Sequence, residues 1–136
     1  MTRKVEKKLP CCILLVDDEA NVRTVFSDVL KRAGYRVKTV GDGHEAVKEV
    51  EENTYNLALV DLRMPKMDGI EVLENIKKRK PELPVIIYTG YGSVTTAVEA
   101  MRKGASDYLN KPFSPEELKL SIKKVLEQKG NTPQPL

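Results

Sequence analysis

The sequence has few of the residues that build disulfide frameworks and zinc sites. It contains two cysteines, Cys11 and Cys12, which are adjacent, and one histidine, His44. Two neighbouring cysteines and a single histidine do not have the spacing of a structural metal site, and a disulfide framework needs further cysteines. We therefore expect both cysteines to pack as small apolar side chains, in a protein that works in the reducing cytoplasm.

Long hydrophobic runs and a strong charge imbalance are also missing. No apolar run approaches the roughly 20 residues of a membrane-spanning helix, and no apolar segment of a secretory signal follows the basic N-terminal residues. The net charge is +3, and basic residues cluster only at residues 3–8 and 77–80. Without interleaved aromatic side chains or a reading helix, these clusters are typical of solvated tails and helix ends. We expect no membrane partner, and direct nucleic-acid binding by this segment is only a minor alternative.

The size and composition of the chain are those of one globular domain. The chain has 136 residues, of which 40% are hydrophobic and 32% charged, which excludes a disordered protein. Residues 1–10 form a basic tail, and residues 11–129 form the predicted domain. Residues 130–136 have the composition of a linker or disordered tail.

Five short apolar runs end in polar residues and alternate with stretches of helical periodicity. Such runs are typical of parallel strands that are buried on both faces of a sheet. The pattern predicts a doubly wound α/β domain whose five-stranded parallel sheet has the order 2-1-3-4-5. The predicted strands are residues 12–16, 35–40, 57–60, 85–88 and 108–109, and the predicted helices are residues 22–33, 43–50, 70–80, 94–103 and 115–129.

The predicted helices differ in the quality of their ends. Ser114, followed by proline and by Glu117 three residues on, predicts a capping box at the start of the last helix. Gly34 and Gly104 are expected just beyond the ends of two others. By contrast, residues 93–96 are a poor first turn, because β-branched side chains lose rotamer freedom in a helix. The fourth helix is therefore a candidate moving part, with an apolar face formed by Val94, Ala97, Val98 and Met101.

Polar residues whose side chains could bind a ligand or take part in a reaction stand at the ends of the predicted strands. Asp17 and Asp18 follow the first strand, Asp61 ends the third, Thr89 ends the fourth and Lys111 follows the fifth. In a doubly wound sheet, the ligand site lies beyond the carboxyl ends of the strands. The sequence therefore predicts that three carboxylates, a hydroxyl and an ammonium converge there.

The three carboxylates point to a divalent cation. Their mutual repulsion should raise at least one pKa or recruit a cation, and oxygen ligands with open water positions suit Mg²⁺. An alternative is that Asp17 and Asp18 cap the first helix, but a cap accounts for only one carboxylate. Lys111 and Thr89 beside Asp61 would then bind further anionic oxygens, which favours phosphoryl transfer with Asp61 as the acceptor. Taken alone, Thr89 could be an ordinary strand-end hydroxyl and Lys111 a surface lysine.

Four motifs in register resemble the receiver domains of two-component response regulators. The resemblance runs from about Cys12 to Lys129, and residues 94–108 are similar to receivers of the nitrogen-regulator class of enhancer-binding transcriptional activators. It implies the (βα)5 flavodoxin-like receiver fold. The motifs are Val-Asp-Asp-Glu at 16–19, Leu-Val-Asp-Leu-Arg-Met-Pro at 59–65 with Asp-Gly at 68–69, Tyr-Thr-Gly at 88–90, and Asp-Tyr-Leu-Asn-Lys-Pro-Phe at 107–113.

The resemblance implies a role for each site residue. Asp61 would accept a phosphoryl group from a sensor histidine kinase, and Lys111 would pair with that group. Mg²⁺ would be bound by Asp18, Asp61 and the backbone carbonyl of Arg63, with Asp17 acting mostly through water. The domain would not be an enzyme with turnover, since it would perform only its own phosphotransfer and slow self-dephosphorylation.

The resemblance also implies a switch. Thr89 would move towards the phosphoryl group, Tyr108 would follow it inward, and the fourth helix would be repositioned. The alternative for Tyr108 is a strand aromatic that simply packs in the core. Gly90 would leave room for the phosphoryl group, and the bond before Pro112 would be cis. The altered surface would then act through a homodimer of the fourth and fifth helices or through a downstream output domain, in control of transcription.

Two bulky residues stand at positions that vary most in the family. Arg63 and Tyr91 flank the pocket, and we hypothesise that they screen attacking water and prolong the phosphorylated state. The alternative is that both point to solvent and serve partner choice.

The residues argue against three other classes of protein. A flavin-binding module needs a phosphate-cradling loop after the first strand, but the acidic loop at 17–19 would repel phosphate. An aspartate-nucleophile phosphohydrolase carries a second aspartate two residues after the nucleophile, where Arg63 stands and cannot act as an acid. A module that is not phosphorylated is disfavoured by the complete set of site residues.

Overall fold

Ten elements alternate along the chain as strand and helix. The computed structural model describes residues 11–90 and 92–130. The strands are β1 (Cys12–Val16), β2 (Arg36–Val40), β3 (Leu57–Asp61), β4 (Val85–Thr89) and β5 (Asp107–Asn110), and the helices are α1 (Ala20–Arg32), α2 (Gly43–Glu52), α3 (Gly69–Arg79), α4 (Val94–Arg102) and α5 (Pro115–Gly130).

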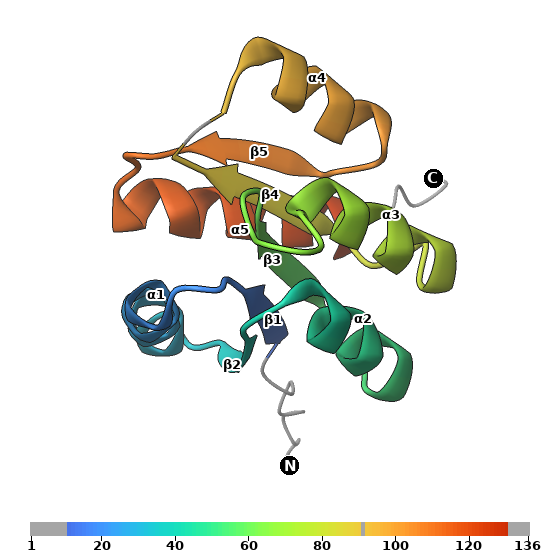
Figure 1. Cartoon of the computed structure of the whole chain (residues 1–136). Helices are drawn as coiled ribbons and strands as arrows, with labels where there is room; N and C mark the ends of the chain where they lie inside the picture. The colour runs from blue at the N-terminus through green and yellow to red at the C-terminus, as the bar shows by residue number, and fades with distance from the viewer. Residues whose placement is uncertain (1–10, 91, 131–136) are drawn as a thin grey trace, which may run out of the picture.

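The five strands form one parallel sheet in the order β2-β1-β3-β4-β5. This order confirms the predicted doubly wound fold. Figure 1 shows the sheet between two layers of helices, with α1 and α5 on one side and α2 and α3 on the other. Strands β3 and β4 are buried along their whole length, as expected for strands that are covered on both faces.

Each face of the sheet has its own hydrophobic core. Alternate residues of one strand point to opposite faces, so Leu14 and Val16 pack with α2 and α3, whereas Ile13 and Leu15 pack with α1 and α5. All four are fully buried. The continuous apolar run of β1 is therefore explained by burial on both faces.

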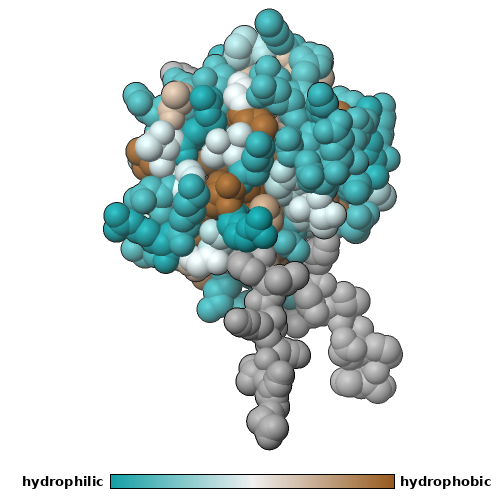
Figure 2. Space-filling view, turned by 90° about the horizontal axis from the view of Figure 1, so that it is seen from below, coloured by the Kyte–Doolittle hydropathy of each residue, from teal (hydrophilic) through white to brown (hydrophobic). Residues whose placement is uncertain are grey.

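Strand β2 lies at an open edge of the sheet. Arg36 and Lys38 are exposed there and alternate with half-buried Val37 and Thr39. Charged side chains on an edge strand oppose pairing with a second sheet. Figure 2 shows the molecule from below, and the described part of this face is mostly hydrophilic with separate small hydrophobic areas.

The predicted helix ends are largely confirmed. Gly34 and Gly104 have φ angles of 101° and 104° directly after the last helical turns of α1 and α4, a conformation in which glycine is strongly favoured. At the start of α5, the Glu117 backbone N–H donates to Ser114 Oγ and the Ser114 N–H donates to Glu117 Oε1. Helix α5 reaches Gly130, one residue into the segment predicted as a linker.

Helix α4 differs most from its sequence pattern. Its apolar face is on the outside, because Val94, Val98 and Met101 are 81%, 45% and 48% exposed, while Ala100 is buried. Its first turn is also better hydrogen-bonded than its β-branched composition suggests, since Ser93 and Thr96 form a capping box. On α1, Val25 is likewise 57% exposed. The apolar stripe of α4 therefore predicted the helix but not which side faces the core, whereas Val22, Phe26 and Leu30 of α1 do pack into the core.

The tails lie outside this description. The predicted basic tail, residues 1–10, and residues 131–136 are not among the described residues, so the proposed domain limits stay a prediction. Cys11 and Cys12 are free and half-buried. Within the described ranges, every helix is too short or too polar to cross a membrane.

Candidate functional site

The carboxyl ends of the strands bring the predicted acidic residues together. Asp17 follows β1 directly, and Asp61 is the last residue of β3. Because β1 and β3 are neighbours in the sheet, ligand oxygens of Asp17, Asp18 and Asp61 all lie within 4.8 Å of one another. Asp17 and Asp61 are buried, and Asp18 is exposed. The three carboxylates therefore form one acidic cluster, which extends from the buried interior to the surface.

Asp61 is held by the loop that follows it. Its Oδ1 accepts a hydrogen bond from the Arg63 backbone N–H at 3.4 Å. Gly69, the first residue of α3, packs against the same turn, and a Cβ there would lie 2.6 Å from the Asp61 carbonyl oxygen and 2.7 Å from Leu62 Cα. Only glycine allows α3 to begin this close to the end of β3.

The environment of Asp61 disfavours its charged form. Burial, followed by repulsion from Asp17 and a smaller contribution from Asp18, raises the pKa of Asp61 to about 7. The Arg63 N–H and the Lys111 ammonium lower the pKa but do not compensate. This excess of negative charge confirms the predicted repulsion, and a bound cation would relieve it. The donor set of three carboxylates therefore fits a hard divalent ion.

The acidic pair does not cap the first helix. Glu19 is the N-cap residue of α1, and its side chain makes no capping hydrogen bond. Asp17 Oδ1 instead accepts from the Glu19 backbone N–H at 2.8 Å. Arg23 closes the turn, because its Nη1 donates to the Asp17 carbonyl oxygen at 2.7 Å. The alternative interpretation of Asp17 and Asp18 as a helix cap is therefore wrong.

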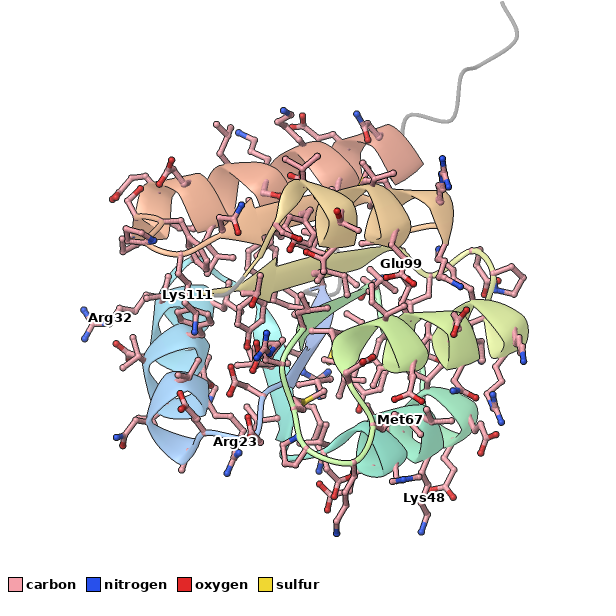
Figure 3. The ribbon with its side chains drawn as sticks, turned by 45° about the horizontal axis from the view of Figure 1, so that its top comes forward. Arg23, Arg32, Lys48, Met67, Glu99 and Lys111 are labelled. Atoms are coloured by element: carbon pink, nitrogen blue, oxygen red, sulfur yellow. The ribbon has the colours of Figure 1, made fainter. Side chains whose placement is uncertain are left out.

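Thr89 is the last residue of β4, and Lys111 directly follows β5. Thr89 is fully buried at the end of β4, and its carbonyl oxygen accepts a hydrogen bond from the Lys111 backbone N–H at 2.8 Å. The Lys111–Pro112 peptide bond is cis, as the resemblance implied. Figure 3 shows Lys111 beside α1, where it borders an open cavity of about 590 Å³ together with Phe26 and Gly90. Lys111 therefore lines this cavity and is close enough to Asp61 to lower its pKa.

The proposed switch residue Tyr108 contacts α4. It is half-buried, and its hydroxyl lies 2.8 Å from the Thr96 hydroxyl. The same Thr96 oxygen accepts from the Ser93 N–H in the capping box. Gly92 is packed against this contact, because a Cβ there would overlap the Tyr108 hydroxyl. Tyr91, the second predicted flanking residue, lies outside the described residues, whereas Arg63 is exposed.

Sequence reasoning missed the contribution of Tyr88. This residue of β4 is fully buried, and its hydroxyl donates to Asp17 Oδ2 at 2.6 Å. Burial and the neighbouring Asp17 carboxylate raise the pKa of Tyr88 well above its usual value. A signal was available, because a tyrosine inside an apolar strand needs a hydrogen-bond partner, but the partner is 71 residues away.

Comparison with known proteins agrees with this geometry. Residues 13–123 match the family model of the response regulator receiver domain. The transcriptional regulatory protein ZraR of Klebsiella oxytoca is 45% identical over 114 residues, which cover 84% of this chain and 26% of ZraR. A putative NtrX-like response regulator of Rickettsia bellii is 38% identical over 117 residues, which cover 85% of this chain and 24% of that protein. The chain thus spans about a quarter of these relatives.

Solved structures show the same fold. A CheY-like receiver domain protein from Methanospirillum hungatei superposes with a TM-score of 0.88 at 32% identity, covering 92% of this chain and all of that one. The receiver domain of NtrX from Brucella abortus gives a TM-score of 0.80 at 36% identity, with 85% of this chain and 98% of that one covered. On fold, site and similarity, the chain belongs to the family of response regulator receiver domains, the signalling domains of two-component systems.

Proposed function

We propose that Asp61 is the phosphoacceptor of this receiver domain, with a sensor histidine kinase as the phosphodonor. The observation that carries this proposal is a buried carboxylate at the end of β3, next to two further carboxylates and within the electrostatic influence of Lys111. An Asp61 oxygen would form a bond to phosphorus while the bond between phosphorus and the donor imidazole breaks. The electron pair of that bond stays on the imidazole nitrogen.

The residues around Asp61 are suited to Mg²⁺. We infer that Asp18, Asp61 and the Arg63 carbonyl oxygen hold the ion, with Asp17 contributing mainly through water. When bound, the ion neutralises charge on the carboxylates and on the phosphoryl oxygens. It would also favour the ionised form of Asp61, whose pKa of about 7 otherwise leaves it partly protonated near neutral pH.

Lys111 and Thr89 would bind the phosphoryl group on Asp61. The Lys111 ammonium would pair with a phosphoryl oxygen, and the Thr89 hydroxyl would donate to another. Movement of Thr89 would draw Tyr108 inward and release it from Thr96, which changes the position of α4. Similarity to ZraR, a transcriptional regulatory protein, supports an output domain that controls transcription in the cytoplasm.

Acetyl phosphate tests this proposal without a kinase. The parent chain, incubated with acetyl phosphate and Mg²⁺, should gain one labile phosphoryl group by intact mass, and Asp61→Asn should gain none. Asp68→Asn is the matched control, because Asp68 caps α3 outside the acidic cluster and asparagine is an equally good N-cap. Persistence of the labile adduct in Asp61→Asn would rule out the proposed acceptor. A phosphatase assay should show no turnover.

A further inference from the structure

The Tyr88 side chain reaches across the sheet from β4 to β1. Its hydroxyl donates to Asp17 Oδ2 at 2.6 Å, and the Glu19 backbone N–H donates to Asp17 Oδ1 at 2.8 Å. Both Asp17 oxygens are therefore bound by donors, and both Asp17 and Tyr88 are fully buried. Two donors on opposite oxygens fix the rotation of the carboxylate, so the remaining lone pairs have one orientation relative to Asp18 and Asp61.

The ring of Tyr88 contacts the basic side of the same site. The Lys111 Nζ lies over this ring, 5.5 Å from its centroid, within the range of a cation–π interaction. The rings of Phe26 and Phe113 pack around Tyr88, with centroids 5.3 Å and 6.3 Å away. Helix α1 and the loop before α5 therefore keep the Tyr88 ring in place, so its hydroxyl and its face have little freedom.

We propose that Tyr88 is a positioning residue of the phosphorylation site, in which the hydroxyl orients Asp17 for cation binding and the ring places the Lys111 ammonium. This inference rests on the proposed Mg²⁺ site. Tyr88 touches neither the cation nor the phosphoryl group in this scheme, and it acts through Asp17 and Lys111. Residues that hydrogen-bond to metal-binding carboxylates commonly change metal affinity about 10- to 100-fold when they are replaced.

Two substitutions separate the hydroxyl from the ring. Tyr88→Phe removes only the hydroxyl, so the dissociation constant for Mg²⁺ should rise about tenfold, a larger change than that in the rate of phosphorylation by acetyl phosphate at saturating Mg²⁺. Tyr88→Leu also removes the ring, so this saturating rate should fall about fivefold because Lys111 loses its cation–π contact. The dissociation constant is measured by following amide resonances during a Mg²⁺ titration.

Tyr55→Phe is the matched control. Tyr55 is also a partly buried tyrosine whose hydroxyl donates to a carboxylate, that of Glu49, at 2.5 Å, but Glu49 lies outside the acidic cluster. Urea unfolding of all variants reports the loss of stability from each hydroxyl. A purely structural role for Tyr88 predicts that both phenylalanine variants lose stability and keep the parent Mg²⁺ affinity.

The outcomes distinguish this inference from the function on which it rests. If the parent does not bind Mg²⁺ and is not phosphorylated, the proposed function fails and the role of Tyr88 fails with it. If the parent binds Mg²⁺ but Tyr88→Phe binds it equally well or more tightly, only the role of the hydroxyl is rejected. Should Tyr88→Leu not fold, the split between affinity and saturating rate in Tyr88→Phe still decides the question.

Discussion

At the scale of single residues, the folded protein holds the carboxylate of Asp61 close to two other carboxylates, and these like charges repel one another. Asp61 is 8% exposed and stands against two further carboxylates. A residue selected for stability alone would not be an acid here, because burial beside like charge disfavours the ionised form. The acidic cluster therefore lowers the stability of the folded state, and the surrounding core offsets this cost.

This repulsion predicts how stability depends on pH. The folded protein keeps a proton on Asp61 up to about pH 7, whereas the unfolded chain releases it near the ordinary value of 3.8. Between these values the folded state binds more protons, so the stabilising effect of the protonated carboxyl is lost as the pH rises through this window. Without Mg²⁺, Asp61→Asn should be more stable than the parent at pH 8 by about 1–2 kcal/mol, after allowance for solvent screening.

Urea unfolding at pH 5 and pH 8 measures this difference. The advantage of Asp61→Asn should be smaller at pH 5, where the parent carboxyl is already protonated. Mg²⁺ at pH 8 should stabilise the parent more than Asp61→Asn, because only the parent retains all three carboxylates. An equal advantage at both pH values would show that the charge of Asp61 is not its source.

The side chain of Arg63 is expected to affect the rate at which the phosphorylated form is hydrolysed. Arg63 is exposed, and its backbone N–H donates to Asp61 Oδ1. If the side chain screens attacking water, Arg63→Ala should shorten the lifetime of the phosphorylated form severalfold. The loss of the phosphoryl adduct over time, followed by intact mass, measures this lifetime, and Arg36→Ala on the edge strand is a matched control. An unchanged lifetime would assign Arg63 to another role, such as partner choice.

At the scale of elements, α4 has a capped first turn but buries few of its side chains against the rest of the domain. Its capping box satisfies the Ser93 and Thr96 backbone N–H groups, but most of its apolar side chains are exposed and Ala100 alone is buried in the helix. Helices in proteins are stabilised mainly by packing of an apolar face. The stability of α4 therefore depends on its first turn, which is also the part that contacts Tyr108.

Removing the Thr96 hydroxyl should loosen α4. Thr96→Val keeps the shape of the side chain but loses the hydrogen bond from the Ser93 N–H, which is half of the capping box, and the contact with Tyr108. The free energy of local opening should therefore fall by about 1 kcal/mol. Amide hydrogen exchange in α4 would accelerate, while exchange in α5, which has its own capping box, would not. Thr95→Val, at an exposed threonine of the same turn, is the control. Equal exchange rates in the two variants would remove Thr96 from this role.

At the scale of the whole molecule, the outward apolar side chains of α4 predict an interface. Val94, Val98 and Met101 are on the described surface, and Leu120 of α5 is 58% exposed. Clustered apolar side chains on a surface often mark a site of association. We expect phosphorylation to promote a homodimer through α4 and α5, which would bring two output domains together.

Met101→Glu tests this interface. The substitution places charge on α4 far from the acidic cluster, so phosphorylation by acetyl phosphate should be unchanged while dimerisation of the phosphorylated form weakens at least tenfold, about 1.4 kcal/mol. Sedimentation equilibrium measures the dimer, and Val25→Glu, at another exposed apolar position, on α1, is the control. Equal loss of the dimer in both variants would assign it to general charge repulsion.

The sequence by itself determined the order of elements and the identity of the principal site residues. Strand positions follow from apolar runs such as residues 57–60, and helix ends follow from local signals such as Gly34 and Ser114. The site was predictable because Asp17 and Asp61 each stand directly at the end of a strand. In a parallel sheet, neighbouring strand ends meet at one edge, so position in the sequence translates into proximity.

Only the tertiary structure decided which partners these residues meet. The contact of Tyr88 with Asp17 joins β4 to β1 across β3. The outward orientation of the apolar side chains on α4 depends on how that helix packs against β5. The raised pKa of Asp61 needs both burial and the distances among three carboxylates. Local patterns encode the period and the ends of an element, whereas its rotation and long-range contacts come from packing the whole chain at once.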